Sequence, residues 1–161
     1  MRVEITAVGR MKAGPEKDLF DLFSKRFDAT GRGVSLGPLT LSEVEEKRNL
    51  ERSELAEREG DKILGTLSKG AKLVVLDERG RSLESTAFAE KLSAWRDESV
   101  PTCTFVIGGA GGLSNAVRER ADLKLSFGHQ TWPHMLARVM LSEQLYRAAT
   151  ILAGHPYHRD G

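Results

Sequence analysis

The sequence predicts an α/β fold in which helices cover both faces of a mostly parallel sheet. Two apolar runs, at 71–77 (AKLVVLD) and 102–107 (TCTFVI), are continuous rather than alternating, which is typical of strands buried on both faces of a parallel sheet. Segments with the apolar spacing of helices separate the expected strands. The 161 residues contain no internal repeat or clear linker, so we expect a single domain over residues 1–161.

The N-terminal part of the chain predicts a strand, a helix and an edge strand. Residues 2–8 have a strand-like pattern, and Pro15 is well placed at the first position of the helix that follows. Apolar residues recur along this helix at helical spacing: Leu19, Phe20, Leu22, Phe23 and Phe27. Residues 34–41 are interrupted by a proline, which favours an edge strand over a central one.

The middle of the chain begins with a strongly charged segment, residues 42–68, in which Glu54 precedes Arg58 at a spacing that stabilises helices. We expect a solvated helix here, broken near Gly60; the alternative is a mobile arm that contacts a partner. After the strand at 71–77, residues 79–81 (RGR) predict a turn. Ser85 is then a candidate N-cap for the next helix.

The C-terminal part predicts two helices around a last strand. Ser114 is a good N-cap for a short helix that ends at Ala121, and residues 123–127 predict the strand. Pro133 and Gly154 mark the beginning and the end of the final helix, which is roughly 30 Å long at 1.5 Å per residue.

Composition excludes several classes of protein. The net charge of +1 does not by itself indicate a nucleic-acid binder, and the single cysteine excludes an internal disulfide. No apolar run is long enough to cross a membrane, and the N-terminus does not resemble a signal peptide, so we expect a cytoplasmic protein. His129 and His134 are five residues apart without a third ligand at metal-site spacing, so we expect no metal.

A glycine-rich segment, residues 108–112 (GGAGG), follows a buried strand, where α/β proteins place their ligands. A dinucleotide fingerprint starting at Gly109 requires glycine or alanine where Ser114 stands, and a phosphate-binding P-loop requires a lysine that is absent. The segment therefore predicts a backbone that a ligand or another chain segment approaches closely; a tight turn without a ligand is the alternative. Asp77 and Glu78 are candidate general bases or exposed turn carboxylates.

The most unusual stretch is 125–159, which contains all four histidines and both tyrosines of the chain. The charges on its apolar helix, Arg138, Glu143 and Arg147, predict either salt bridges or contacts with a substrate. The tail at 155–159 (HPYHR) combines cationic and stacking groups that suit an RNA strand, although docking by Tyr157 alone is the alternative.

These stretches together carry a resemblance to a known family. The segments are ITAVGR at 5–10, VVLDERG at 74–80, FVIGGAGGL at 105–113, LSFGHQTWPHMLARVMLSEQLYRA at 125–148 and HPYHR at 155–159. In combination they resemble the ribosomal RNA large subunit methyltransferase H family, over essentially the whole chain. That family consists of SPOUT methyltransferases, so the resemblance implies a deep C-terminal trefoil knot, bound S-adenosyl-L-methionine and a homodimer. It also implies methylation of N3 of a pseudouridine in the helix-69 loop of 23S rRNA, on the assembled 70S ribosome.

The resemblance implies roles for individual residues. The expected cofactor contacts are Leu76, Gly108, Phe127, Gly128, His129, Gln130, Thr131 and Trp132. S-adenosylmethionine has no phosphate, which agrees with the absence of phosphate-binding signatures. The candidates for removing the N3 proton are His158, Tyr157 and Glu143, and those for contacting the RNA are Arg138, Arg147, His155 and Arg159. The alternatives are a non-catalytic RNA-binding or ribosome-associated dimer of the same fold and, on the glycines alone, a nicotinamide-dependent oxidoreductase, which their spacing disfavours.

Overall fold

The computed structural model describes residues 1–159 and contains one five-stranded sheet, in which every strand pair is parallel and the order is β2-β1-β4-β3-β5. The strands are β1 (Arg2–Val8), β2 (Leu39–Val44), β3 (Lys72–Ser82), β4 (Thr102–Ile107) and β5 (Leu123–Ser126). The helices are α1 (Pro15–Gly31), α2 (Arg52–Thr66), α3 (Ser85–Asp97), α4 (Asn115–Arg120) and α5 (His134–Ala153), with a 3-10 turn at Arg32–Val34. The predicted α/β class with a parallel sheet is confirmed.

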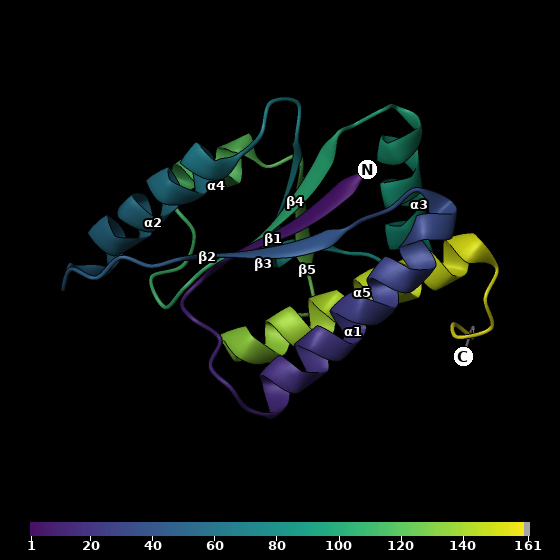
Figure 1. Cartoon of the computed structure of the whole chain (residues 1–161). Helices are drawn as coiled ribbons and strands as arrows, with labels where there is room; N and C mark the ends of the chain where they lie inside the picture. Colours follow the sequence, from purple (N-terminus) through teal and green to yellow (C-terminus); the bar gives the residue numbers. More distant parts are fainter. Residues whose placement is uncertain (160–161) are drawn as a thin grey trace.

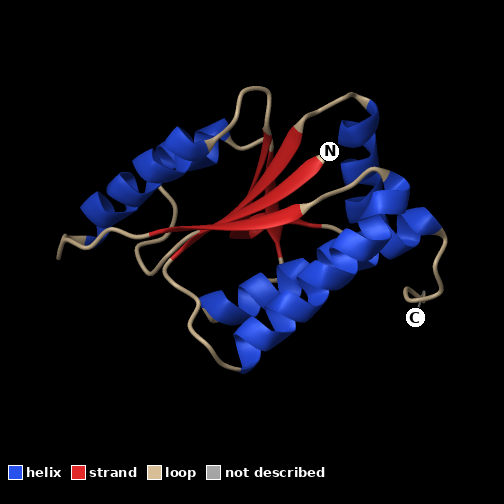
Figure 2. Cartoon of the chain, viewed as in Figure 1, coloured by secondary structure: helices blue, strands red, loops and turns tan. Residues whose placement is uncertain are grey.

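Helices cover both faces of the sheet, with α2 and α4 on one face and α1, α3 and α5 on the other (Figures 1 and 2). Successive side chains of a strand point to opposite faces, so Leu73 and Val75 of β3 pack under α2 and α4, whereas Val74 joins the larger core on the other face. The central strand β4 is buried along its whole length, which explains its continuous apolar sequence.

The charged segment folds differently from the prediction. The edge strand is confirmed at the sheet edge, but it begins at Leu39 and extends to Val44, because its pairing with β1 continues that far. The expected helix break near Gly60 is wrong, since α2 runs unbroken from Arg52 to Thr66. Gly60 is buried, and a Cβ there would collide with Ser114, so this glycine lets α2 and α4 approach closely. The helix packs on the sheet through Ile63 and is not a detached arm.

The expected turn at 79–81 is also wrong. Strand β3 continues to Ser82, and its pairing with β5 shifts register between Leu76 and Arg81. Gly80 lies so close to the Lys124 carbonyl that a side chain there would collide with it. The extension of β3 is therefore fixed by contacts with β5 rather than by a local turn.

The predicted helix starts at Pro15 and Pro133 are confirmed, and so are two of the other three predicted helix ends. Ser114 caps α4 by accepting a 3.3 Å hydrogen bond from the Val117 N–H, and Gly154 ends α5 with a positive φ of 71°. Ser85 does not cap α3, because its hydroxyl instead donates to the Gln144 side chain at 2.7 Å and joins α3 to α5. The passage of the C-terminal segment through a trefoil knot stays a prediction.

Candidate active site

A cavity of about 380 Å³ opens at the carboxyl ends of β4 and β5 and beside the part of β3 that follows its pairing with β4. Its walls come from Leu76 near the middle of β3, from Gly108 directly after β4 and from the loop after β5. Of the residues expected to contact a cofactor, those lining the cavity are Leu76, Gly108, Phe127, Gly128, Gln130, Thr131 and Trp132. His129 is exposed and does not line it. Parallel strands thus bring segments from distant parts of the sequence to one concave surface.

The loop that follows β5 is held by its own polar groups. The Ser126 hydroxyl accepts a hydrogen bond from the Gly128 N–H at 3.0 Å and lies 3.1 Å from the Glu78 carbonyl of β3. Trp132 closes the loop by donating its indole N–H to the Phe127 carbonyl at 3.2 Å. Gly128 has a φ of 105°, a conformation that favours glycine. The loop therefore has a defined shape before any ligand binds.

The glycine segment forms the opposite wall. The Gly112 N–H donates to the Gly109 carbonyl at 3.0 Å, which folds the segment back on itself. Behind it, a Cβ on Gly109 would lie 2.7 Å from Val8, and one on Gly111 would lie 3.0 Å from the Arg52 carbonyl. The predicted close approach is thus made by β1 and α2 on one side, while Gly108 and Gly109 face the cavity on the other.

Charged side chains that the sequence did not single out also line the cavity. Arg118 of α4 lies 3.5 Å from the Asp77 carboxylate, which also accepts the Arg79 N–H at 3.0 Å. The Asp77 side chain is 8% exposed, whereas Glu78 is exposed, and both residues lie within β3 rather than in a turn. Arg52 reaches the cavity from α2. The sequence feature that could have identified Arg118 as a cavity residue is its position on the helix that follows the glycine segment.

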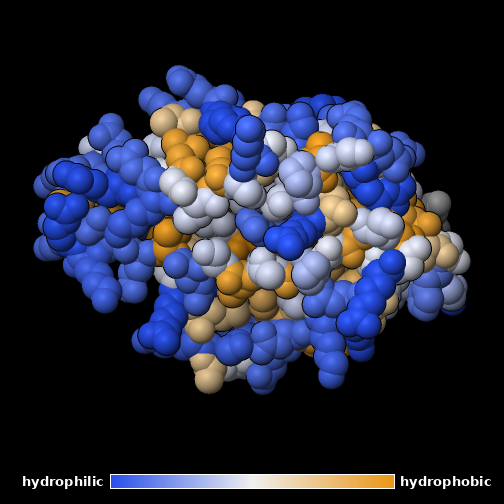
Figure 3. Space-filling view, turned by 45° about the horizontal axis from the view of Figure 1, so that its top comes forward, coloured by the Kyte–Doolittle hydropathy of each residue, from blue (hydrophilic) through white to orange (hydrophobic). Residues whose placement is uncertain are grey.

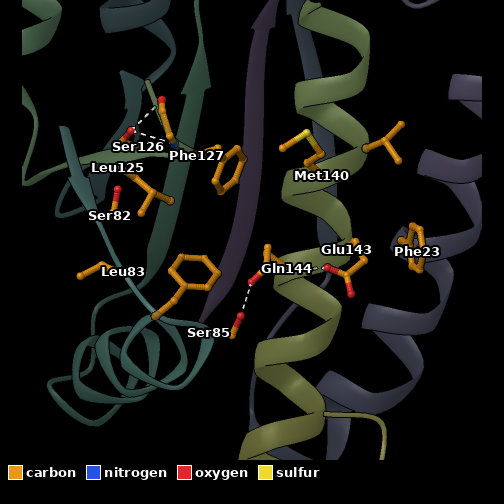
Figure 4. A pocket seen from close by; sticks show the side chains of 13 residues that line it. Phe23, Ser82, Leu83, Ser85, Leu125, Ser126, Phe127, Met140, Glu143 and Gln144 are labelled. Atoms are coloured by element: carbon orange, nitrogen blue, oxygen red, sulfur yellow. Dashed lines mark hydrogen bonds between the residues drawn. The ribbon is translucent and has the colours of Figure 1, made fainter. Parts of the chain in front are cut away.

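A second cavity, of about 540 Å³, lies beside the first and is bounded by α1, α3 and α5 (Figure 4). Both cavities share Leu125, Phe127 and Gly128 as a wall. The second is mainly apolar, and Phe127 points toward Met140 of α5 across it (Figure 4). Its polar edge is formed by Gln144, which accepts from Ser85 and donates to Glu143 at 3.0 Å.

The tail docks on α5 at this polar edge. The Tyr157 hydroxyl donates to Glu143 Oε1 at 2.9 Å, and the Arg147 guanidinium donates to the same oxygen at 2.6 and 3.0 Å. The guanidinium lies 4.8 Å over the Tyr157 ring and contacts the His158 ring nitrogen Nδ1 at 3.2 Å. The structure thus brings together Glu143, Tyr157 and His158, and it shows both the intrahelical salt bridge and the docked Tyr157 that were open alternatives.

The electrostatics of this cluster follow from its contacts. Burial and the adjacent Glu143 carboxylate raise the pKa of the Tyr157 phenol above its ordinary value. Glu143 also raises the pKa of Arg147, against the opposing effect of burial. The phenol therefore stays protonated at neutral pH and acts as a hydrogen-bond donor.

Comparison with known proteins identifies the family. Residues 1–158 match the family model described as predicted SPOUT methyltransferase. The chain belongs to the SPOUT methyltransferase family. Proteins named ribosomal RNA large subunit methyltransferase H are similar over 99% of both chains: those of Paramagnetospirillum magneticum (strain ATCC 700264 / AMB-1), Rhodopseudomonas palustris (strain TIE-1) and Ruegeria sp. (strain TM1040) are 54%, 53% and 51% identical.

Among solved structures, the SpoU methyltransferase AviRb from Streptomyces viridochromogenes, in complex with AdoMet, is 17% identical with a TM-score of 0.39. The match covers 91% of this chain and 59% of that one. This likeness is too distant to place a ligand in this SPOUT methyltransferase.

Within the SPOUT methyltransferase, the tail cluster and the first cavity contact different parts of α5. The first cavity contacts α5 at His134 and Ala137, whereas the cluster is built on Glu143 and Arg147. At 1.5 Å per residue, the six positions from Ala137 to Glu143 span about 9 Å along the helix axis. Glu143 lines the second cavity, and none of Glu143, Tyr157 and His158 lines the first.

The expected RNA contact of Arg138 does not fit its placement in this SPOUT methyltransferase. Arg138 is fully buried and donates to the Glu43 carboxylate at 2.7 Å and to the Val8 and Gly9 carbonyls at 3.0 and 2.7 Å. A guanidinium enclosed in this way does not face a phosphate. His155 and Arg159, in contrast, are exposed.

Within residues 1–159, no group of three or more histidine, cysteine, aspartate or glutamate side chains is arranged to hold a metal ion. In the same part of the chain, the helices are too short or too polar to span a bilayer.

Proposed function

We propose that this SPOUT methyltransferase uses S-adenosyl-L-methionine to methylate N3 of a pseudouridine in the helix-69 loop of 23S rRNA, on the assembled 70S ribosome. The observation that carries the proposal is the cavity at the carboxyl ends of β4 and β5, in a chain that is 51% to 54% identical over 99% of its length to proteins named for ribosomal RNA methylation. Such a substrate would place the protein in the cytoplasm.

The residues of this cavity fit the proposed cofactor. Its volume of about 380 Å³ lies in the range of roughly 300–1,000 Å³ that is usual for ligand pockets. Leu76, Phe127 and Trp132 offer apolar surface for an adenine ring, and the glycine backbones offer hydrogen-bonding groups. The buried Asp77 carboxylate is an acceptor for hydroxyl or ammonium groups.

Bound S-adenosylmethionine supplies an electrophilic methyl group on its sulfonium. The chain has to place the nucleophilic nitrogen in line with that methyl and accept the proton that N3 loses. We assign these tasks to the tail cluster. Glu143 holds Tyr157 and Arg147 in place, the protonated Tyr157 donates hydrogen bonds, and the imidazole of His158 is the candidate base. Arg147, His155 and Arg159 are the proposed contacts with RNA phosphates.

The absence of the tail-cluster residues from the lining of the first cavity supports a homodimer. Four large apolar side chains are 40% to 42% exposed and lie on α1, on α5 and on the loop that precedes α5: Leu19, Leu22, Leu136 and Trp132. A second copy of the chain that packed against these side chains would remove their apolar surface from water. We propose that the tail of one copy stands beside the cofactor cavity of the other, which completes the site.

Two measurements test the proposed function. Calorimetry should detect binding of S-adenosylmethionine to the purified protein; absence of binding would favour a non-catalytic RNA-binding dimer. In cells that lack the gene, mass spectrometry of 23S rRNA should show a helix-69 pseudouridine without its methyl group. An unchanged nucleoside would rule out the proposed target and leave the fold assignment in place.

A further inference from the structure

Helix α2 carries a buried carboxyl group that no step above uses. Glu59 is 5% exposed, and its Oε1 atom is buried without a hydrogen-bond partner among residues 1–159. Lys62, one turn further along α2, is engaged elsewhere, because its ammonium donates to the Glu45 carbonyl at 2.6 Å and pairs with Glu46 at 3.4 Å. A buried polar group without a partner opposes folding, so its presence requires an explanation.

Glu59 lies directly behind the glycine wall of the cofactor cavity. A Cβ on Gly109 would lie 3.4 Å from Glu59 Oε1, and Gly109 itself lines the cavity, so the carboxyl lies next to a residue of the cavity wall. The neighbouring positions that α2 buries on this face include Ala56 and Ile63, which are apolar. An acid at this one position is therefore not required to fill the space.

The charged residues that line the cavity have a net positive charge, which an additional acid would reduce. Three arginines, Arg52, Arg79 and Arg118, line it against two acids, Asp77 and Glu78. This excess of positive charge opposes a ligand that carries a cation at its centre. The space-filling view shows hydrophilic side chains gathered over the end of the molecule that α2 forms (Figure 3), whereas Glu59 is enclosed beneath that surface.

We propose that Glu59 is a specificity-determining residue that makes the cavity favour the positively charged sulfonium cofactor over its neutral demethylated product. This inference rests on the proposed function. Transfer of the methyl group turns the sulfonium into an uncharged thioether, so the attraction to Glu59 is present before the reaction and absent after it. Glu59 thereby strengthens cofactor binding and does not retain the product.

The titration of Glu59 provides a second signature. Burial raises the pKa of Glu59; Lys62 opposes this effect and Glu46 adds to it. Val8 of β1, which is uncharged, lies close to the same face of Gly109 as Glu59. Helix α4 and strand β2, which also pack against α2, carry Arg118 and Glu43, and the cavity beyond contains the three arginines and two acids. The preference for the cofactor over its product should therefore increase as the pH rises through the raised pKa.

The test is calorimetry of full-length protein with S-adenosylmethionine and S-adenosylhomocysteine, for wild type, Glu59→Gln, Glu59→Asp and Glu57→Gln. Glu57 is exposed on the same helix and serves as the matched control for loss of a charge. We expect Glu59→Gln to weaken binding of S-adenosylmethionine by about tenfold and to leave binding of S-adenosylhomocysteine unchanged. A tenfold effect is the size expected for two unit charges about 12 Å apart at an effective dielectric constant of about 20. Glu59→Asp should retain part of the preference, and Glu57→Gln all of it.

Equal weakening of both ligands by Glu59→Gln would show a merely structural role and overturn the proposal, as would unchanged affinity for both. The ratio of the two affinities should vary with pH in wild type and stay constant in Glu59→Gln; the same pH dependence in both proteins would contradict the inference. If wild type binds neither ligand, the proposed function itself fails, which is a different result from a variant that binds both as wild type does.

Discussion

Arg138 of α5 donates a hydrogen bond of 2.7 Å to the carboxylate of Glu43 of β2, a residue 95 positions earlier in the sequence. The same guanidinium donates to the carbonyls of Val8 and Gly9, where β1 ends. The ion pair therefore fastens the final helix to the edge of the sheet. It fixes the helix whose first turns line the first cavity and whose middle part carries Glu143 and Arg147, which contact the tail.

Replacing the buried cation should destabilise the fold. Arg138→Ala removes an ion pair and leaves two carbonyls without their donor, so we expect the free energy of unfolding to fall by roughly 3 kcal/mol. Chemical denaturation measures the loss. Arg58→Ala on the exposed face of α2 is the matched control and should change stability by less than about 0.5 kcal/mol. Similar values for the two variants would contradict the fastening role of Arg138.

The same pair predicts a pH dependence of stability. Burial alone would raise the pKa of Glu43, but the Met11 N–H and the Arg138 guanidinium outweigh it and hold the pKa below its ordinary value of 4.5. The stabilisation is thus fully present above that value and is lost as the pH falls through the lower, folded-state pKa. Wild type should exceed Glu43→Gln in stability by a constant amount above about pH 5, and by a shrinking amount below it. A difference that grows on acidification would reverse the assigned sign.

Local signals in the sequence predicted the parts of the fold that local chemistry determines. The buried strand at 102–107, the cap at Ser114 and the end of α5 at Gly154 depend on neighbouring residues, and the structure has all three. The extension of β3 depends instead on Gly80 meeting the Lys124 carbonyl, far along the chain. The spacing of apolar residues along the sequence cannot indicate a contact between distant residues, so a turn was predicted where the strand continues.

The predictions for the candidate site also depended on whether the relevant residues are close together in the sequence. The glycine segment at 108–112 was predicted to lie at a ligand site because it follows a buried strand, whereas the loop after β5 was expected there only from the family resemblance. Arg138 looked like an RNA contact because a charge on an apolar helix is either paired or functional, and its partner Glu43 lies in a distant strand. Glu59 and the second cavity were missed because both arise from packing between helices and other elements rather than from a motif.

Two glycines of α2 should respond in opposite ways to the same substitution. Gly60 packs against Ser114, so Gly60→Ala forces α2 and α4 apart and should destabilise the protein by about 1–3 kcal/mol. Nothing lies within 4 Å of the position of a Cβ on Gly65, so Gly65→Ala should stabilise it by up to about 1 kcal/mol through helix propensity alone. Thermal unfolding compares the two. An equal gain in both variants would mean that α2 and α4 are not in close contact.

Complementation between inactive chains tests the shared site. One variant lacks residues 155–161, and the other carries Gly128→Val, a β-branched residue at a φ of 105° in the cavity loop. Each homodimer should be inactive, and the tail-deleted protein should still bind S-adenosylmethionine. Heterodimers, isolated from co-expressed chains with two different tags, should recover methyl transfer because one site is complete. Heterodimers as inactive as both parents would contradict a tail that serves the partner's cavity.

The central claim is tested most directly by reconstituting the reaction. Purified protein is incubated with S-adenosylmethionine and 70S ribosomes that lack the modification, and the nucleosides of 23S rRNA are then analysed by mass spectrometry. We predict the gain of one methyl group on the helix-69 pseudouridine, at N3, and no gain when the protein is omitted. A methyl group on another nucleotide, or no methylation by protein that binds the cofactor, would contradict the proposed function.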